Sequence, residues 1–414
     1  MAVDQKPGSA GVAGMLGGTC EQKSEIAAIQ PGMAHLQQKH DLTVWPHEGF
    51  IDFHQRVNFP CLARFPGIDA SVIPRHSLQP KGGTIMTAQT HAIRLPRFGG
   101  PDALSLDRID LPDPGPGEIQ VRHDAIGVNF IDIYYRRGVF AAPLPLPSGL
   151  GVEGVGQVTA VGEGVTGFAP GDRVAYVGGP PGAYSDMRNL PAARAVKAPE
   201  GIDDTTLAAM TFKGLTAEYL IHRCVAVRPG DRVLFHAAAG GVGSIACQWL
   251  HAIGAEVIGT VGSQAKVDTA RRNGCAHVIV AGTEDIADRV KQITGGAGVR
   301  AAFDSVGADT FAASLDSLAP RGILVSFGES SGPVPPLPVA SLGARGSLFV
   351  TRPSIAHYTA DPAEYQAAAQ RLFAAMADGT LAPPQVTTYP LARAAEAQDD
   401  MENRRTQGSV VLLP

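Results

Sequence analysis

The segment His236-Ala-Ala-Ala-Gly-Gly-Val-Gly243 decides the fold of this chain. It follows a short apolar run at residues 232–235 and precedes a stretch with the apolar spacing of a helix. A glycine-rich turn between a strand and a helix lets a pyrophosphate approach the free backbone N–H groups of the helix start. Gly240 and Gly243 occupy the second and third glycine places of this pattern, which serve close phosphate approach and helix–strand packing. The segment therefore predicts a dinucleotide site.

Strands and helices continue to alternate on the carboxyl side of this turn. Five short apolar runs are separated by stretches of helical pattern, and they fall at residues 256–261, 277–280, 301–306, 322–327 and 347–351. Such alternation is typical of crossover units in a parallel sheet. The runs are almost continuously apolar, as expected of strands covered by helices on both faces. We therefore expect an α/β fold with a doubly wound parallel sheet, a Rossmann domain, over residues 213–352.

The amino-terminal side of the turn has a different pattern. Residues 87–199 are rich in strand signals separated by Pro-Gly and Gly-Asp turns, such as Pro170-Gly-Asp172. Proline and glycine at these places exclude helices and central strands, so we expect an antiparallel, barrel-like lobe. A helix at 361–378 and strands at 385–389 and 409–413 are expected to return to it. The predicted catalytic domain thus comprises residues 86–212 and 353–414, with the Rossmann domain inserted between them.

Composition excludes several classes of protein. The 414 residues are 44% hydrophobic and 18% charged, with a net charge of −5. These values argue against a coiled coil, a disordered acidic protein and a basic nucleic-acid-binding surface. No apolar stretch reaches the roughly eighteen residues of a membrane span. The five cysteines form no Cys-x-x-Cys pair, so neither a disulfide framework nor a cysteine-rich zinc site is expected.

Residues 1–85 lack sustained helical or alternating apolar patterning. We expect them to be an N-terminal extension, either a disordered appendage or the product of a start codon placed too far upstream. They contain neither the apolar core of a signal peptide nor a basic transit pattern, since the first arginine is Arg56. We therefore expect a cytoplasmic protein.

The second strand of the Rossmann domain indicates which dinucleotide is bound. An NAD site usually ends this strand with an acid that accepts from the ribose hydroxyls. Here the segment reads Thr260-Val-Gly-Ser-Gln-Ala-Lys266 and has no acid. The hydroxyl of Ser263 and the positive charge of Lys266 suit a 2′-phosphate instead. The sequence thus favours NADPH, with the alternative that Lys266 is an ordinary solvated residue.

Seven collinear motifs extend these observations to a family. They are Ala125-Ile-Gly-Val-Asn-Phe-Ile-Asp-Ile-Tyr134, Leu146-Pro-Ser-Gly-Leu-Gly151, Lys213-Gly-Leu-Thr-Ala-Glu-Tyr219, Phe235-His-Ala-Ala-Ala-Gly-Gly-Val-Gly243, Phe303-Asp-Ser-Val-Gly307, Val350-Thr-Arg-Pro-Ser354 and Arg404-Arg-Thr-Gln-Gly-Ser409. Over residues 88–414 the chain resembles the zinc-free quinone oxidoreductases of the medium-chain dehydrogenase/reductase superfamily, the branch that includes zeta-crystallin. The resemblance implies a GroES-like barrel domain, a Rossmann domain and NADPH-dependent reduction of quinones by hydride transfer.

The resemblance also bears on zinc. Zinc-dependent members of the superfamily place a cysteine ligand where this chain has Asn129 and a histidine ligand where it has Val152. Valine cannot bind a metal and asparagine is a poor zinc ligand. We therefore expect no metal. A quinone is strongly electrophilic, so its reduction needs little help from a Lewis acid.

The resemblance implies a set of site residues. Tyr134 is the first choice for orienting the acceptor or donating to its oxygen, with the alternative that it only packs against the nicotinamide, and Asn129 is the second. The cofactor-binding residues would be Phe130, Ile131, Asp132, Tyr134, Tyr219, Gly240, Gly241, Val242, Gly243, Gly262, Ser263, Lys266, Ser305, Glu329, Ser330, Phe349, Val350, Thr351 and Arg404. His236 is expected to be a core histidine.

Three positions depart from the family pattern and two other functions stay open. Ala281 and Phe140 each stand where relatives have a tyrosine, and Glu329 stands where a neutral asparagine occurs. An acid near phosphates is unfavourable unless it contributes through its backbone. The same hydride could instead reduce the double bond of an enone or alkenal, or the protein could be an NADPH-binding structural or sensing protein. A homodimer, paired through the edge strand 347–351, is implied by the resemblance.

Overall fold

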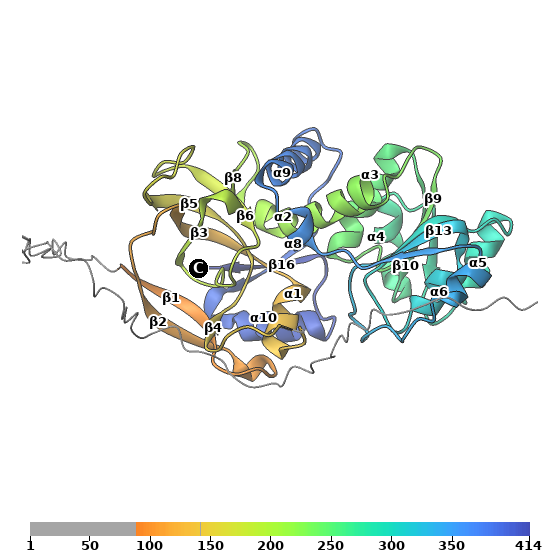
Figure 1. Cartoon of the computed structure of the whole chain (residues 1–414), viewed down its shortest axis with the longest axis horizontal. Helices are drawn as coiled ribbons and strands as arrows, with labels where there is room; N and C mark the ends of the chain where they lie inside the picture. Colours follow the sequence, from red (N-terminus) through yellow and green to blue (C-terminus); the bar gives the residue numbers. More distant parts are fainter. Residues whose placement is uncertain (1–87, 141) are drawn as a thin grey trace, which may run out of the picture. The chain divides into compact units, whose positions relative to one another are not determined.

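The protein is described here from a computed structural model that covers residues 88–140 and 142–414 (Figure 1). The expectations for residues 1–85 lie outside this part of the chain. In the described residues no helix is both long enough and apolar enough to cross a membrane.

The Rossmann sheet contains six parallel strands in the order β11-β10-β9-β12-β13-β14. The strands are β9 (Arg232–Phe235), β10 (Glu256–Val261), β11 (His277–Val280), β12 (Val299–Asp304), β13 (Leu318–Ser326) and β14 (Phe349–Thr351). The order reverses between β9 and β12, and ligands of open α/β sheets bind outside the strand carboxyl ends at such a point. The predicted doubly wound fold is confirmed.

Helices cover both faces of this sheet, as the apolar strands predict. The side chains of Val233 and Phe235 join one core cluster and that of Leu234 joins another, because successive residues of a strand point to opposite faces. The first cluster contains side chains of α3 (Gly241–Ile253) and α4 (Val267–Arg272), and the second those of α5 (Ile286–Thr294) and α6 (Phe311–Asp316).

The remaining strands build the barrel-like lobe. A small sheet has the order β2-β1-β4 and a seven-stranded one contains β15-β16-β3-β5-β6-β8, with β7 paired to β3. The strands are β1 (Ala88–Leu95), β2 (Ser105–Leu111), β3 (Glu118–Val128), β4 (Ser148–Gly149), β5 (Glu153–Val161), β6 (Arg173–Val177), β7 (Met187–Pro191), β8 (Ala195–Lys197), β15 (Val386–Pro390) and β16 (Ser409–Leu413). β16 pairs antiparallel with β3, so the carboxyl-terminal segment returns to this lobe as expected.

Short helices complete the lobes. They are α1 (Phe130–Arg137), α7 (Ala340–Ala344), α8 (Ile355–Tyr358), α10 (Ala394–Glu402), η1 (Pro101–Ala103), η2 (Ala192–Arg194), η4 (Gln264–Lys266) and η5 (Leu391–Arg393). Among them α1 matters most for the site, because it starts directly after the buried strand β3.

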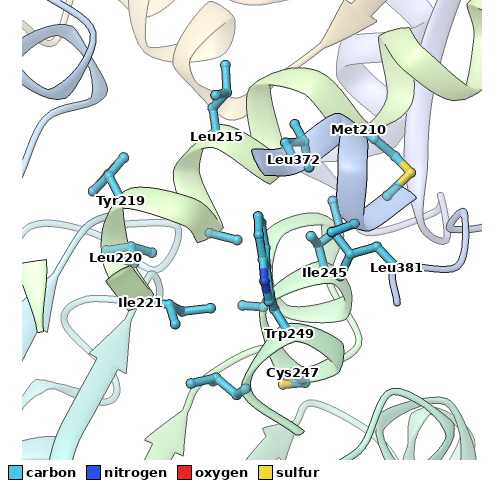
Figure 2. Packing of buried hydrophobic residues seen from close by; sticks show 14 of the residues in the cluster. Met210, Leu215, Tyr219, Leu220, Ile221, Ile245, Cys247, Trp249, Leu372 and Leu381 are labelled. Atoms are coloured by element: carbon cyan, nitrogen blue, oxygen red, sulfur yellow. The ribbon is translucent and has the colours of Figure 1, made fainter. Parts of the chain in front are cut away.

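Helix α2 (Asp204–Glu218) joins the two lobes and continues into a π-helical turn, η3 (Tyr219–Cys224). Its amino end is capped by Asp203, whose carboxylate accepts from the N–H of Thr206 at 2.9 Å. Its residues pack against α3 and against α9 (Pro362–Ala377) in one apolar cluster (Figure 2). A Cβ on Gly214 would lie 2.4 Å from Cδ1 of Leu372, so a larger residue there would force the Leu372 side chain to move.

Candidate functional site

The glycine-rich turn offers free donors at the start of α3. Gly240 is the residue before the helix, and its carbonyl accepts the first helical bond, from Ser244. The N–H groups of Gly241, Val242 and Gly243 have no partner within the described part of the chain. A Cβ on Gly243 would lie 2.2 Å from the carbonyl oxygen of Ala237, which requires glycine there. The turn thus suits an anionic pyrophosphate, whose charge the helix start stabilises.

His236 holds the beginning of this turn from inside the domain. Its ring is fully buried, with Nδ1 3.1 Å from Thr260 Oγ1 and Nε2 2.9 Å from Ser314 Oγ. Ser314 donates its own proton to Asp304, so Ser314 Oγ accepts from the Nε2–H of His236. Burial lowers the pKa of His236, which keeps the ring neutral. The prediction of a satisfied core histidine is confirmed.

The end of β10 is open and lacks a carboxylate. Gly262 and Ser263 are exposed and Lys266 is half-exposed in η4. Lys266 makes no ion pair with any residue of 88–140 or 142–414, so its ammonium remains available to a ligand. This arrangement fits the predicted 2′-phosphate and offers no carboxylate at this strand end to accept from free ribose hydroxyls.

The start of α1 is a buried hydrogen-bonded corner. Asp132 Oδ2 accepts from the backbone N–H of Asn129 at 2.9 Å and from the hydroxyl of Tyr184 at 2.9 Å. Asp132 Oδ1 is buried without a partner. Burial is the main reason why the pKa of Asp132 rises to about 7, and the Glu153 charge adds to the rise. Asp132 therefore serves the conformation of this turn, which positions Phe130, Ile131 and Tyr134.

Glu153 connects this corner to α2. The carboxylate is fully buried; Oε1 accepts from the N–H of Phe212 at 2.6 Å and Oε2 from Asn129 Nδ2 at 2.7 Å. Because a carboxylate only accepts, it fixes the orientation of the Asn129 amide. Burial raises the pKa of Glu153, and the nearby charge of Lys213 opposes that rise. Glu153 and Lys213 carried no prediction, because their burial, which marks them as candidates, becomes visible only in the fold.

Tyr134 links the two lobes. Its hydroxyl accepts from the backbone N–H of Glu329, beyond the end of β13, at 3.3 Å. The Glu329 carboxylate lies 3.2 Å from the guanidinium of Arg352, which neutralises it. Arg352 thus offsets the acid that departs from the family pattern, and the contribution of Glu329 to cofactor binding stays a prediction. Burial raises the pKa of Tyr134, so the phenol keeps its proton at neutral pH. Arg352 is another residue that the sequence reasoning missed.

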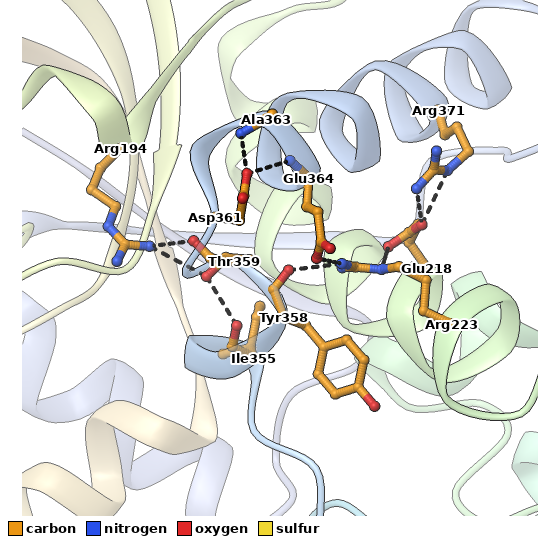
Figure 3. A network of polar contacts seen from close by, with 10 residues as sticks. All are labelled: Arg194, Glu218, Arg223, Ile355, Tyr358, Thr359, Asp361, Ala363, Glu364 and Arg371. Atoms are coloured by element: carbon orange, nitrogen blue, oxygen red, sulfur yellow. Dashed lines mark hydrogen bonds and ion pairs between the residues drawn. The ribbon is translucent and has the colours of Figure 1, made fainter.

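Tyr219 lies in the first turn of η3 and is stacked on Tyr358, with ring centroids 4.5 Å apart. The preceding residue, Glu218, is fully buried and accepts from Arg223 at 3.0 Å and from Arg371 at 2.6 Å. Figure 3 shows this network, in which Arg223 also bonds the carbonyl of Tyr358. The network fixes the turn that carries Tyr219. Tyr358 was not predicted, because only the fold brings it to Tyr219.

The other predicted residues follow strand ends or sit on exposed turns. Ser305 follows β12, and Ser330 lies in the loop after β13. Phe349, Val350 and Thr351 form the edge strand β14, where Phe349 is 60% exposed. Arg404 is exposed after α10 with a left-handed backbone, φ 58°. Their contacts with a cofactor stay predictions.

The two positions at which zinc-dependent relatives carry metal ligands hold Asn129 and Val152 in this chain. The amide of Asn129 donates to Glu153, and the side chain of Val152 is buried. In residues 88–140 and 142–414, His, Cys, Asp and Glu side chains form no group of three or more suited to a metal. The predicted absence of zinc stays a prediction, which metal analysis of the purified protein can test.

Two family models match this chain and define the class of protein to which it belongs. Residues 115–200 match the family model of the alcohol dehydrogenase GroES-like domain, and residues 241–374 match that of the zinc-binding dehydrogenases. Both domains together are those of a medium-chain dehydrogenase/reductase. The match to the second model concerns the domain and not the two ligand positions described above.

Individual relatives narrow the class. A quinone oxidoreductase of Pseudomonas aeruginosa is 47% identical over 78% of this chain and 99% of its own length. A 2-haloacrylate reductase of a Burkholderia species is 45% identical over 80% of this chain and 99% of its own length. The structure of the Escherichia coli quinone oxidoreductase complexed with NADPH matches with a TM-score of 0.76 and 44% identity, covering 79% of this chain and all of that one. The chain belongs to the quinone oxidoreductase family of the medium-chain dehydrogenase/reductase superfamily.

Proposed function

We propose that this protein is an NADPH:quinone oxidoreductase that acts without zinc. The observation that carries the proposal is the junction of the two lobes: Tyr134 of the barrel lobe meets Glu329 of the Rossmann domain beside the strand carboxyl ends. This is where an open α/β sheet binds its ligand. NADPH, when bound, supplies the hydride, and the protein contributes binding, orientation and exclusion of water.

The residues at the junction suit hydride transfer to a conjugated acceptor. The hydroxyl of Tyr134 accepts from Glu329 N, so its own proton is free to be donated to an acceptor oxygen. The amide of Asn129 is held by Glu153 and faces the same turn. The free N–H groups at α3 would hold the pyrophosphate, and Ser263 and Lys266 the 2′-phosphate.

The test is steady-state oxidation of NADPH and of NADH with 1,4-benzoquinone and naphthoquinones. We expect turnover of quinones and a clear preference for NADPH in kcat/KM. Binding of NADPH without turnover on any quinone would refute the enzyme and favour a structural or sensing role. A preference for NADH would refute the assignment of Ser263 and Lys266.

A second candidate function has one observation in its favour. The Burkholderia relative, at 45% identity, is named as a reductase of 2-haloacrylate, which carries a conjugated double bond. An activated carbon–carbon double bond can accept the same hydride from the same position. An enone, an alkenal and 2-chloroacrylate in the same assay separate the two functions: a higher kcat/KM on these than on quinones would favour the double-bond reductase.

We further propose a cytoplasmic homodimer. Strand β14 is the edge of the six-stranded sheet, and its exposed Phe349 lies on that edge. Pairing of two β14 strands would satisfy the open backbone groups of both edges. Sedimentation velocity is expected to show twice the chain mass at micromolar concentration; a monomer would contradict the proposal. Fractionation of cells of the source organism tests the location.

A further inference from the structure

Lys213 of α2 is a buried cation that the proposed mechanism does not use. Its side chain belongs to a residue that is only 7% exposed. Among the described residues its ammonium makes one hydrogen bond, to the carbonyl oxygen of Val128 at 3.4 Å, and no ion pair. An ammonium has three N–H donors, so two of them lack a protein partner. A buried charge with unused donors is costly unless it serves a ligand.

The place of Lys213 in the fold indicates which ligand. A Cβ on Gly241 would lie 2.9 Å from Cδ of Lys213, so the lysine stem passes along the first turn of α3. Its Nζ reaches Val128, the residue directly before Asn129 and α1. The ammonium thus lies between the turn predicted to hold the pyrophosphate and the turn that carries Tyr134. A ligand that contacts both turns passes close to it.

Nearby carboxylates stabilise the charge without using its donors. Burial lowers the pKa of Lys213, while the charges of Glu153 and Asp132 raise it. Both oxygens of Glu153 are occupied by Phe212 N and Asn129 Nδ2 instead of the ammonium. Glu153 therefore offsets the positive charge at a distance, and the free N–H groups stay available.

We propose that Lys213 is a ligand-binding residue whose ammonium donates a hydrogen bond to a neutral oxygen of the bound reactants. That oxygen belongs either to the nicotinamide ribose of NADPH or to the carbonyl of the acceptor; the identity of both reactants rests on the proposed function. A charged donor is effective here because Lys213 is buried, where hydrogen bonds are stronger than in water. On an acceptor carbonyl it would also stabilise the negative charge that grows as the hydride arrives.

The test is Lys213→Met in the full chain, which keeps the length of the side chain and removes charge and donors. Thermal unfolding, the Kd of NADPH and kcat/KM for 1,4-benzoquinone are measured together. Removing a buried charge favours folding, whereas leaving Glu153 without its counter-charge opposes folding, so the Tm measures the structural effect of the change separately from its effect on ligand binding. At the same time either the Kd of NADPH should rise or kcat/KM should fall by about tenfold or more, the size of a lost charged hydrogen bond. The matched control is Lys291→Met on α5. This lysine is exposed, and its Nζ lies 3.7 Å from Oδ1 of Asp288.

The two readouts identify the oxygen. A higher Kd of NADPH with an unchanged kcat places the oxygen on the cofactor. An unchanged Kd with a lower kcat/KM places the oxygen on the acceptor. Unchanged values of both, or a lower Tm with a loss of activity that follows it, would overturn the proposal. The Kd of NADPH can be measured even if the wild-type protein does not reduce quinones. A failure of the proposed function is therefore distinguishable from a failure of the Lys213 proposal.

A second variant protects the test against misfolding. Lys213→Met leaves the buried Glu153 without its counter-charge, so Lys213→Met/Glu153→Gln removes both charges together. We expect this double variant to be at least as stable as Lys213→Met and to keep the same ligand defect. Recovery of wild-type ligand binding in the double variant would show that Lys213 only compensates Glu153, and would overturn the proposal.

Discussion

The two ends of the predicted NADPH site are built on opposite principles. At the end of β10, Ser263 and Lys266 are open to solvent and Lys266 has no ion-pair partner in the described chain. At the start of α1, Asp132 and Glu153 are buried, and the hydrogen bonds that they accept come from within the protein. The first end can discriminate between ligands at little structural cost. The second is organised before a ligand arrives, and changes there affect folding as well as function.

The largest effect is expected from Glu153→Ala. The change leaves Phe212 N and Asn129 Nδ2 without their acceptor and Lys213 without its counter-charge. Breaking a buried charged network in this way costs about 3–5 kcal/mol of folding free energy. Urea unfolding measures the loss. Glu163→Ala, at an exposed position of the same lobe, is the control and should change stability by less than about 0.5 kcal/mol. A loss for Glu153→Ala as small as the control's would contradict the network.

A smaller effect is expected from Asp132→Asn, and it depends on pH. The folded pKa of Asp132 is about 7, above the roughly 3.9 of an unfolded aspartate. Folded protein therefore holds this proton more tightly, so the contribution of Asp132 to stability is fully present below pH 4 and is lost as the pH rises through 7. The loss reaches at most about 4 kcal/mol. Asparagine keeps an acceptor for Asn129 N and Tyr184 and does not titrate.

Urea unfolding of Asp132→Asn and wild type from pH 5 to pH 8 measures this difference. We expect the variant to gain in stability relative to wild type as the pH rises. Asp107→Asn, at an exposed position of β2, is the control and should give a flat difference. A variant that loses stability relative to wild type towards pH 8 would show that the ionised carboxylate is the form the fold needs.

The solvent-exposed end of the predicted NADPH site is tested by Lys266→Glu. Replacing the ammonium with a carboxylate next to a 2′-phosphate turns attraction into repulsion, and we expect the Kd of NADPH to rise by about ten- to a hundredfold. The Kd of NADH, which lacks this phosphate, should change by less than about threefold. Lys291→Glu on α5 controls for the change in net charge. Fluorescence titration of both dinucleotides gives the values, and equal effects on the two would exclude a phosphate contact.

The two ends were also unequally predictable from the sequence. The absence of an acid between Thr260 and Lys266 can be seen without any structure, because the strand end and its next residues are local in the chain. The contacts at α1 join residues far apart in sequence: Asn129 with Glu153, Glu153 with Phe212, and Tyr134 with Glu329. Spacing predicted the parallel sheet and the glycine turn, since both follow short periodic patterns. It could not predict Glu153, Lys213 or Tyr358, whose partners only the tertiary fold supplies.

The smallest effect is expected from Tyr134→Phe. The Tyr134 hydroxyl accepts from Glu329 N and has one proton left to donate, so it links the two lobes and can touch the acceptor. A quinone accepts a hydride without a strong acid, and a general acid essential to a reaction is worth about a hundred- to ten-thousandfold in rate. We therefore expect kcat on 1,4-benzoquinone to fall by less than about tenfold, with the Kd of NADPH unchanged. Tyr135→Phe is the matched control. Tyr135 is the next residue of α1; its hydroxyl has no hydrogen-bond partner among the described residues, and its ring packs against Phe140 with ring centroids 4.8 Å apart. A loss on the order of a thousandfold in Tyr134→Phe alone, with cofactor binding intact, would make Tyr134 an essential acid. It would also place proton delivery, and not orientation of the reactants, at the centre of the α1 corner.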